Sequence, residues 1–184
     1  KAVYQFQTKF RNELRAKSGI MRGKEFLMKD LYTFDRNDEE HQKHYAAIRE
    51  AYIRVFQRLG IGDRTYVTFA SGGIFSRFSE EFQTVSEAGE DNIYVSEKKG
   101  IALNQEVLNE ETLDELGVER SELTEMKSIE VGNIFHLGTK FSEPLGLSYK
   151  DEAGEMRPVV MGCYGIGPTR LLGTIVVVLD DEKG

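Results

Sequence analysis

The sequence lacks most of the residues on which covalent cross-links and structural metal sites depend. It has one cysteine, three histidines and no tryptophan among 184 residues. Cys163, as the lone cysteine, cannot form an internal disulfide bond, and three scattered histidines do not complete a structural zinc site. We therefore expect a single apolar core to stabilise the fold without structural metal.

Long apolar runs are also missing. No stretch reaches the roughly 18 apolar residues of a membrane-spanning helix. The first ten residues, KAVYQFQTKF, have neither the apolar region nor the cleavage site of a signal peptide. These absences predict a soluble, cytoplasmic protein with no membrane partner, and the length suits one domain.

Charge is segregated along the chain, although the net charge of -7 hides it. Residues 1–30 contain eight Lys and Arg against three Asp and Glu, whereas residues 80–130 contain fifteen acids against four bases. An acidic total argues against a surface that coats nucleic acid indiscriminately. The local concentration of cations in the first thirty residues still permits a site for phosphates.

The first 34 residues predict a long antiparallel hairpin. Alternation places Tyr4, Phe6, Phe10 and Leu14 on one side, which we expect to be buried, and polar residues on the other. Turn formers occupy residues 15–24, and a second aromatic segment follows. The loop of this hairpin carries the cations.

The next segment predicts an amphipathic helix. Asp35 is a plausible N-cap, the run HYAAIREAYIRVFQRLG has apolar residues at helical spacing, and Gly60 stands where the helix should stop. We expect His41 and His44 on the exposed side of this helix, as surface residues rather than ligands.

The rest of the chain predicts short strands and two helical regions. Acidic residues 106–127 indicate one or two short surface helices broken near Gly117, and a final apolar helix starts at Pro168 and packs on the sheet. Strands are expected at 65–70, 82–86, 93–95, 129–137, 147–149 and 157–163. This order favours an α+β fold, a mostly antiparallel sheet flanked by helices.

A glycine-rich stretch, GCYGIGPTR, opens the final helix. It lacks the Gly-Lys-Ser/Thr ending of a P-loop, and Arg170 stands where the dinucleotide-binding pattern needs a third glycine. An arginine remains in the first turn of a buried helix, next to glycines that let a ligand or a backbone approach. Taken alone, the stretch indicates either a ligand site or tight packing of helix on sheet.

The hairpin and this stretch together resemble a known family. Phe10-Arg11-x-Glu13 followed by Arg22-x-x-x-Phe26 is similar to motif 2 of class II aminoacyl-tRNA synthetases, and Gly165-x-Gly167-x-x-Arg170 is similar to motif 3. The segments GIMRGKEFLMKDLYTF, EAGEDNIYV, IEVGNIFHLGTKFSEPLG and PVVMGCYGIGPTRLL resemble bacterial-type prolyl-tRNA synthetases across nearly the whole chain.

The resemblance implies a partial class II catalytic core over residues 1–184, with motif 2 at about 6–34 and motif 3 at about 158–178. It implies no editing domain, whose place holds at most the acidic segment 106–127, and no anticodon-binding domain in this chain. Motif 1 and the loop that binds the substrate ammonium would lie upstream of Lys1.

The implied activity is ATP-dependent activation of L-proline to prolyl-adenylate, followed by transfer to tRNA(Pro). ATP and Mg²⁺ are the implied cofactors, the acceptor end of tRNA is an implied partner, and the full-length family forms homodimers. Such a displacement depends on alignment and charge neutralisation more than on a nucleophile. We expect the isolated chain to bind ATP weakly and to turn over poorly.

The resemblance also assigns roles to residues of the nucleotide site. Arg11 would fork onto the α-phosphate and the proline carboxylate, and Glu13 would orient the adenine or Arg11 itself. Phe26 would stack on the adenine, with Arg170 covering its other face and reaching the γ-phosphate, which Arg22 would also meet. Arg11 and Arg170 are the expected catalytic residues.

Further positions follow from the same resemblance. Thr139 would lie near the nucleotide, and Glu130 is a weaker candidate for holding Mg²⁺. Phe141 and Cys163, together with Arg11, would form the proline site. In the basic loop, Arg15 and Lys17 would either touch the acceptor end of tRNA or be solvated.

Each role has a structural alternative. The arginines could be solvated or ion-paired, Phe26 and Phe141 could be core residues, and Cys163 a small buried apolar group. Three functions therefore compete: a prolyl-tRNA synthetase core, a related enzyme for another amino acid or acceptor, and a noncatalytic nucleotide-binding module.

Two positions depart from the family pattern. The family often has a histidine where Glu80 stands and a glutamine where His136 stands. We expect these departures to affect local substrate contacts.

Overall fold

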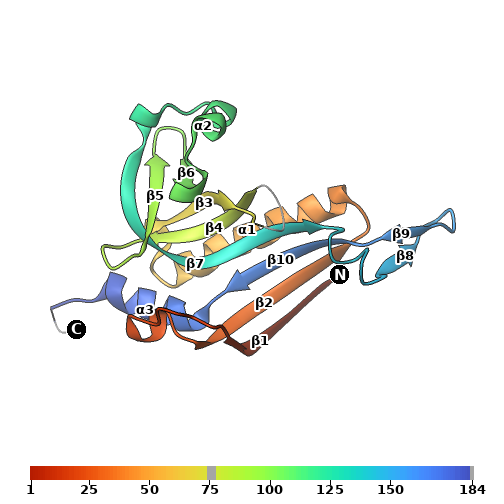
Figure 1. Cartoon of the computed structure of the whole chain (residues 1–184), viewed down its shortest axis with the longest axis horizontal. Helices are drawn as coiled ribbons and strands as arrows, with labels where there is room; N and C mark the ends of the chain where they lie inside the picture. The colour runs from red at the N-terminus through yellow and green to blue at the C-terminus, as the bar shows by residue number, and fades with distance from the viewer. Residues whose placement is uncertain (74–77, 183–184) are drawn as a thin grey trace.

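The computed structural model describes residues 1–73 and 78–182, which form one large sheet with helices packed on it (Figure 1). Within these residues, eight strands follow the order β1-β2-β10-β7-β4-β3-β6-β5, and β5 also pairs with β7. Every pairing is antiparallel except β3 with β6. The predicted α+β fold with a mostly antiparallel sheet is confirmed.

The strands of this sheet are β1 Ala2–Phe10, β2 Glu25–Asp35, β3 Thr65–Ser71, β4 Phe78–Val85, β5 Asp91–Ser96, β6 Ile101–Asn104, β7 Thr124–Gly138 and β10 Val160–Ile166. A separate hairpin consists of β8 Ser148–Lys150 and β9 Met156–Pro158. The helices are α1 Asp38–Arg58, α2 Glu110–Leu116 and α3 Pro168–Leu179, with short 3-10 turns that include η1 Gly19–Met21. The sequence did not predict β6, and it left residues 124–127 in a helical segment although they begin β7.

The predicted hairpin is formed by β1 and β2, paired in register from Ala2 opposite Thr33 to Phe10 opposite Glu25. Its apolar side is not buried as expected, because Tyr4 is 71% exposed, Phe10 75% and Leu14 87%. β1 is the edge strand of the sheet, and the helices pack on the strands next to it. Alternation identifies residues that share a face, but it does not tell whether another element covers that face.

Helix α1 covers one face of β2 and β10 and provides much of the core (Figure 1). Tyr45, Tyr52 and Phe56 are buried there with Phe82 and Tyr164. The helix ends at the predicted place, since Gly60 adopts a φ of 79°, which favours glycine.

The start of α1 differs from the prediction. Asn37 is the N-cap, and its side chain accepts a hydrogen bond from the backbone N–H of Glu40. Asp35, the predicted cap, is instead the buried last residue of β2.

A smaller lobe contains β5, β6 and α2, at the top of Figure 1. Its own core is made of Leu103, Val107, Leu113 and Val118. The predicted break at Gly117 is confirmed, because α2 ends there in the left-handed conformation.

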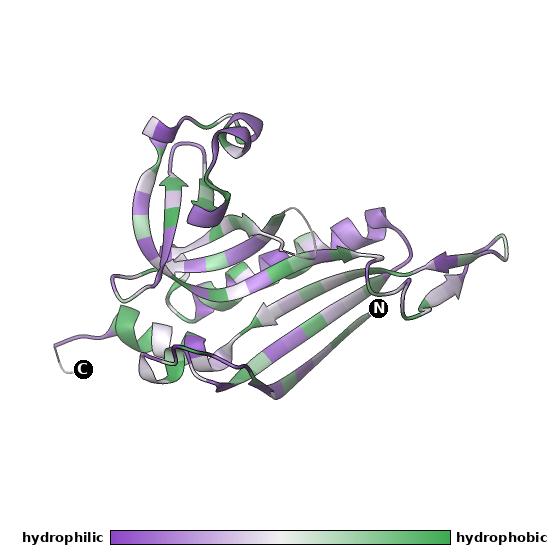
Figure 2. Cartoon of the chain, viewed as in Figure 1, coloured by the Kyte–Doolittle hydropathy of each residue, from purple (hydrophilic) through white to green (hydrophobic). Residues whose placement is uncertain are grey.

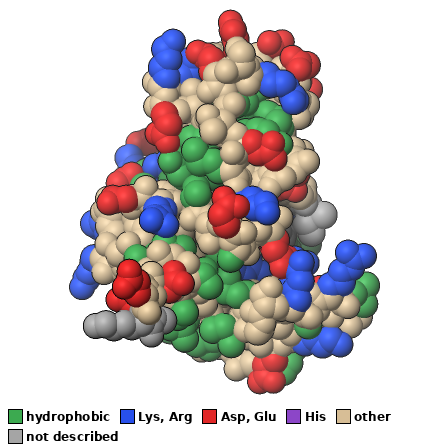
Figure 3. Space-filling model, turned by 90° about the vertical axis from the view of Figure 1, so that its left-hand side faces the viewer, with side chains coloured by type: hydrophobic (Ala, Val, Ile, Leu, Met, Phe, Trp, Pro, Cys, Tyr) green, Lys and Arg blue, Asp and Glu red, His purple; other side chains and the backbone are tan. Residues whose placement is uncertain are grey.

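Helix α3 begins at the predicted Pro168, in the first helical position. Figure 2 shows that it is largely hydrophobic. It buries Leu171 and Val178, whereas Leu172 and Val176 are each 57% exposed. Figure 3 shows hydrophobic side chains gathered on the lower part of the face that carries α3. The predicted packing therefore holds for one side of the helix only.

No helix in the described part of the chain is long and apolar enough to cross a membrane.

Candidate active site

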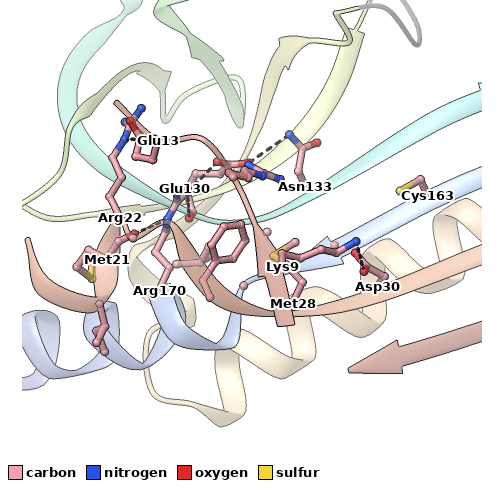
Figure 4. A pocket seen from close by; sticks show the side chains of 18 of the residues that line it. Lys9, Glu13, Met21, Arg22, Met28, Asp30, Glu130, Asn133, Cys163 and Arg170 are labelled. Carbon is pink, nitrogen blue, oxygen red and sulfur yellow. Dashed lines mark hydrogen bonds and ion pairs between the residues drawn. The ribbon is translucent and has the colours of Figure 1, made fainter. Parts of the chain in front are cut away.

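A cavity of about 510 Å³ opens between the β1–β2 hairpin, strands β7 and β10, and the start of α3 (Figure 4). Both predicted motifs contribute residues to the lining of this cavity. Arg11, Glu13, Arg22 and Phe26 from the first motif and Arg170 from the second all line it. The structure thus brings together two groups of residues that are far apart in the sequence.

The floor of the cavity follows a row of paired residues across the sheet. Asp30 of β2 lies opposite Gly165 of β10, which lies opposite Asn133 of β7. A Cβ atom on Gly165 would come within 3.2 Å of the Met28 methyl carbon. Because Gly165 has no side chain, a ligand can lie against its backbone between Asp30 and Asn133.

Arg170, in the first turn of α3, donates hydrogen bonds to three acceptors. Its Nε donates to the carbonyl oxygen of Met21 at 3.1 Å, and its Nη1 donates to the carboxylate of Glu130 at 3.0 Å and to the Glu130 carbonyl at 3.3 Å. Met21 belongs to η1, in the loop of the first motif, and packs against Gly173 of α3. The two motifs are therefore in direct contact.

Arg11 lies over the ring of Phe26, with Cζ 5.1 Å from the ring centroid. Its backbone N–H donates to the carbonyl of Lys24 and closes the loop between β1 and β2. The guanidinium and the aromatic face are thus adjacent. A base that stacks on this face of Phe26 would displace Arg11 toward the open cavity.

Arg22 bridges two carboxylates. Its Nε donates to Glu13 at 2.9 Å and its Nη1 to Glu90 at 3.0 Å, and Glu90 also pairs with Lys17 at 3.0 Å. Hydrogen bonds from the backbone of Arg15 and the side chain of Arg22 lower the pKa of Glu13. Burial acts to raise the pKa of Glu90, but the two cations hold it below its usual value.

Glu90 was not predicted from the sequence. It follows Gly89, which lies so close to β7 that a Cβ atom would be 2.2 Å from the carbonyl oxygen of Ser128. In the sequence, the run EAGED is part of a segment that resembles the family, and only the structure shows that it brings a carboxylate to the basic loop.

The other end of the cavity, to the right in Figure 4, contains Lys9, Asp30 and Cys163. Asp30 is 5% exposed and accepts from Lys9 at 2.8 Å and from Gln7 at 3.0 Å. Burial, and then the negative charge of Asp30, raise the pKa of Cys163 to about 11. Cys163 is thus a neutral thiol at this end of the cavity. The sequence did not predict the Lys9–Asp30 pair beside it.

Two predicted residues lie outside the cavity lining. Thr139 is in the turn after β7, where its carbonyl accepts from the backbone of Glu143. Phe141 packs in a cluster with Phe135 and Cys163, which do line the cavity. Phe141 therefore belongs to the apolar cluster next to the cavity and not to its lining.

Glu130 lines the cavity, but its carboxylate is occupied. One oxygen accepts from Arg170 and the other from Asn133 at 3.3 Å. In the described residues, no group of three or more His, Cys, Asp and Glu is placed to hold a metal ion. A single carboxylate that already pairs with Arg170 and Asn133 would fit only an Mg²⁺ ion held mainly by phosphates and water.

The departures from the family pattern point away from the cavity. Glu80 pairs with Arg49 of α1 at 2.9 Å, and His136 stacks on Tyr45 of α1 with ring centroids 3.7 Å apart. Neither lines the cavity, whereas Phe135, which alternates with His136 along β7, does. Because neither residue lines the cavity, the structure shows no direct contact through which Glu80 or His136 would affect a bound substrate.

The prediction that His41 is a surface residue is wrong. His41 is 2% exposed. Asp35 accepts a hydrogen bond from its Nδ1 at 3.3 Å, and its Nε2 shares a hydrogen bond of 2.8 Å with Nδ1 of His136. His44, also on α1, is exposed as predicted, and its Nδ1 forms a hydrogen bond with the same Asp35. Burial and the neighbouring His41 lower the pKa of His136 to about 4. The polar partners on β2 and β7 make burial of His41 possible, and helical periodicity does not reveal them.

Comparisons with known proteins identify the family of the chain. The model of the class II tRNA synthetase core domain (G, H, P, S and T) matches residues 2–178. The chain is 38% identical to the proline–tRNA ligase of Rickettsia peacockii over 197 residues, and 38% identical to that of Anaplasma marginale over 200 residues. These matches cover 100% and 99% of this chain but 46% of each relative, so the chain spans about half their length.

A solved structure shares the fold. The prolyl-tRNA synthetase of Cryptosporidium parvum, complexed with L-proline and AMP, has a TM-score of 0.69 and 16% sequence identity; the match covers 100% of this chain and 30% of that one. At this identity the likeness concerns the fold alone. The match over residues 2–178, the α+β sheet and the joined motifs lead to one conclusion: the chain belongs to the class II tRNA synthetase core family.

Proposed function

We propose that this chain is the catalytic core of a proline–tRNA ligase. In this reaction a carboxylate oxygen of L-proline attacks the α-phosphorus of ATP, pyrophosphate leaves, and prolyl-adenylate forms. A ribose hydroxyl at the 3′ end of tRNA(Pro) then takes the acyl group and AMP leaves. The observation that carries the proposal is the convergence of Arg11, Phe26 and Arg170 on one cavity.

The two arginines would act differently. Arg22 now pairs with two carboxylates, which the phosphates of ATP would replace, whereas Arg170 would keep its contact with Glu130 and meet the phosphates as well. Arg11 would fork onto the α-phosphate and the proline carboxylate, which are the reacting groups. Glu13 would hold Arg22 or orient the adenine, which would stack on Phe26.

The proline ring would occupy the end of the cavity near Cys163. This assignment follows from the neutral thiol and from the apolar cluster of Phe135 and Phe141 behind it. Thr139 and Phe141 would influence nucleotide and proline from the edge of the site. Mg²⁺, held chiefly by phosphates beside Glu130, would neutralise charge on the leaving pyrophosphate.

The remaining partners are proposed by similarity. The exposed loop cations Arg15 and Lys17 would meet the acceptor end of tRNA, the whole protein would be a homodimer, and its location would be the cytoplasm. Positive charge near the cavity entrance suits the phosphates of an acceptor stem.

ATP–pyrophosphate exchange by the full-length protein, with each amino acid supplied separately, tests the proposal. We expect exchange with proline and at least about 100-fold less with alanine, because a smaller side chain leaves the apolar pocket unfilled. Exchange with a different amino acid would identify a related enzyme, and no exchange with any amino acid would indicate a noncatalytic nucleotide-binding module.

A further inference from the structure

A chain of hydrogen bonds runs from Arg170 through two other residues that line the cavity, Glu130 and Asn133, and continues to β4. Glu130 of β7 accepts from Arg170 with one carboxylate oxygen and from Asn133 with the other (Figure 4). Asn133 in turn donates to Glu81 of β4 at 3.3 Å. The chain thus joins α3, β7 and β4, and neither Asn133 nor Glu81 was singled out by the sequence.

The amide of Asn133 can have only one orientation. Its Nδ2 donates to both Glu130 and Glu81, each at 3.3 Å, while its Oδ1 is buried with no hydrogen-bond partner among the described residues. Turning the amide over would place its oxygen against two carboxylates. The unpaired oxygen is therefore tolerated because the nitrogen must face the two acids.

Glu81 forms a fixed end of the chain. It is 9% exposed, and its second oxygen accepts from Gln83 at 2.8 Å and from Asn104 at 2.9 Å. With Asn133, three amide groups from β4, β6 and β7 hold one carboxyl group. Because each donor is a side-chain amide on a paired strand, this carboxyl group cannot turn without losing these hydrogen bonds.

We propose that Asn133, anchored by Glu81, is a positioning residue that orients the Glu130 carboxylate and, through it, the guanidinium of Arg170. Without the amide, Glu130 would be free to rotate and the buried Glu81 would lose a donor beside a like charge. Arg170 would then be held less firmly, because one of its three hydrogen bonds goes to the Glu130 carboxylate and the other two go to the backbone carbonyls of Met21 and Glu130. A guanidinium held in advance costs less to align with phosphates.

The nucleotide part of this inference rests on the proposed function, but the positioning itself can be tested without a ligand. The Nε–Hε resonance of Arg170, assigned by its loss in Arg170→Ala, reports whether the guanidinium is held. We expect Asn133→Ala to shift and broaden this resonance. The matched control is Asn92→Ala, which removes an amide of β5 that donates to the side chain of Gln105, and it should leave the resonance unchanged.

ATP affinity, measured by calorimetry on the same proteins, gives the second readout. Asn133→Ala should weaken binding about 10-fold, and it should add no further loss in an Arg170→Ala background, because a residue that acts through Arg170 has nothing left to position. An unchanged resonance in folded Asn133→Ala, or fully additive losses of affinity, would overturn the proposal.

Two further results distinguish a failure of the proposed function, or of folding, from a failure of the positioning role. If the unmutated chain does not bind ATP, the proposed function is in question, while the Arg170 resonance still decides the positioning role. If Asn133→Ala does not fold, Glu81→Gln replaces it: the glutamine keeps the size of the side chain but turns one acceptor into a donor. Glu81→Gln should shift the Arg170 resonance in the same direction by a smaller amount, and an unchanged resonance would contradict the proposed chain of hydrogen bonds.

Discussion

Arg11 and Phe26 face each other across the loop of the first hairpin, with the guanidinium carbon 5.1 Å from the centroid of the ring. One residue comes just after β1 and the other is in β2, so the hairpin register fixes their separation. The same hairpin register places both residues in the lining of the cavity. The cation and the aromatic surface are therefore close enough to contact one ligand that has both a phosphate and a base.

Replacing Phe26 by leucine should weaken ATP binding by about 5- to 10-fold, because leucine keeps apolar area but cannot stack on adenine or contact Arg11 as a cation–π partner. Calorimetric titration with ATP measures the change. Phe10→Leu is the matched control, since Phe10 is 75% exposed and does not line the cavity. Equal affinities for the two variants would argue against adenine on Phe26.

Removing the charge of Glu90 should strengthen ATP binding by about 2- to 5-fold at low salt. Lys17 and Arg22 would no longer be held by this acid and would be available to phosphate, and the effect is limited because exposed ion pairs contribute about 0–1 kcal/mol. The variant is Glu90→Gln, compared by titration with Glu87→Gln, which makes the same change of net charge in the same loop.

The gain should disappear in about 0.5 M salt, where exposed charges are screened. A gain of the same size in Glu87→Gln would mean that net charge alone, and not the release of the two cations, controls affinity.

His136→Gln should make the protein less sensitive to acid. The pKa of His136 is about 4 in the folded chain against about 6.5 when unfolded. Between these values the unfolded state binds more protons, so stability is lost as pH falls from 6.5 to 4. Glutamine does not titrate, and the variant should gain about 1 to 2 kcal/mol relative to the unmodified protein over this window, allowing for partial exposure.

Urea unfolding at pH 7.5 and pH 4.5 measures that difference. The comparison is made between the two proteins at each pH, because Glu81 has the opposite influence: burial, with Glu130 nearby, raises its pKa to about 7, so its contribution to stability is lost as pH rises through that value. A constant difference between His136→Gln and the unmodified protein would show that His136 does not titrate in this window.

Gly173→Ala should loosen the contact between the two motifs. The added Cβ would lie 2.2 Å from the sulfur of Met21, and the carbonyl of Met21 accepts a hydrogen bond from Arg170. We expect a loss of about 1–3 kcal/mol in the free energy of unfolding and weaker ATP binding, because Met21 and its loop must move.

Denaturant unfolding and titration with ATP check both parts of this prediction. Leu172→Ala, at the next position of α3 with a 57% exposed side chain, should change stability by less than about 1 kcal/mol. A Gly173→Ala protein with unchanged stability and affinity would indicate that the flexible Met21 side chain moves aside without carrying the loop.

Local patterns predicted much of the fold. The hairpin, the helix that ends before Gly60, the break at Gly117 and the start of α3 at Pro168 all depend on periodicity or on residues with restricted backbone angles, and these act within a few residues. The same patterns failed for β6, which has only four residues, and for the N-cap of α1, where Asp35 and Asn37 are both suitable.

Burial was predicted less well, because it depends on what covers a face. Tyr4 and Phe10 alternate like core residues, yet β1 is at the edge of the sheet. His41 stands among polar residues, yet it is buried between Asp35 and His136. In both cases the deciding neighbour belongs to another segment of the chain.

The sequence by itself determined which chemical groups are available: guanidinium groups beside a glycine-rich turn and an aromatic residue, in an order typical of one family. Only the tertiary structure decided which of them meet. It places Arg11 on Phe26, Arg170 on Glu130 and Asn133 between two acids, and it leaves Thr139 and Phe141 outside the cavity lining. The physical reason is that strand pairing and helix packing, which join distant segments, set these distances, whereas sequence spacing constrains only near neighbours.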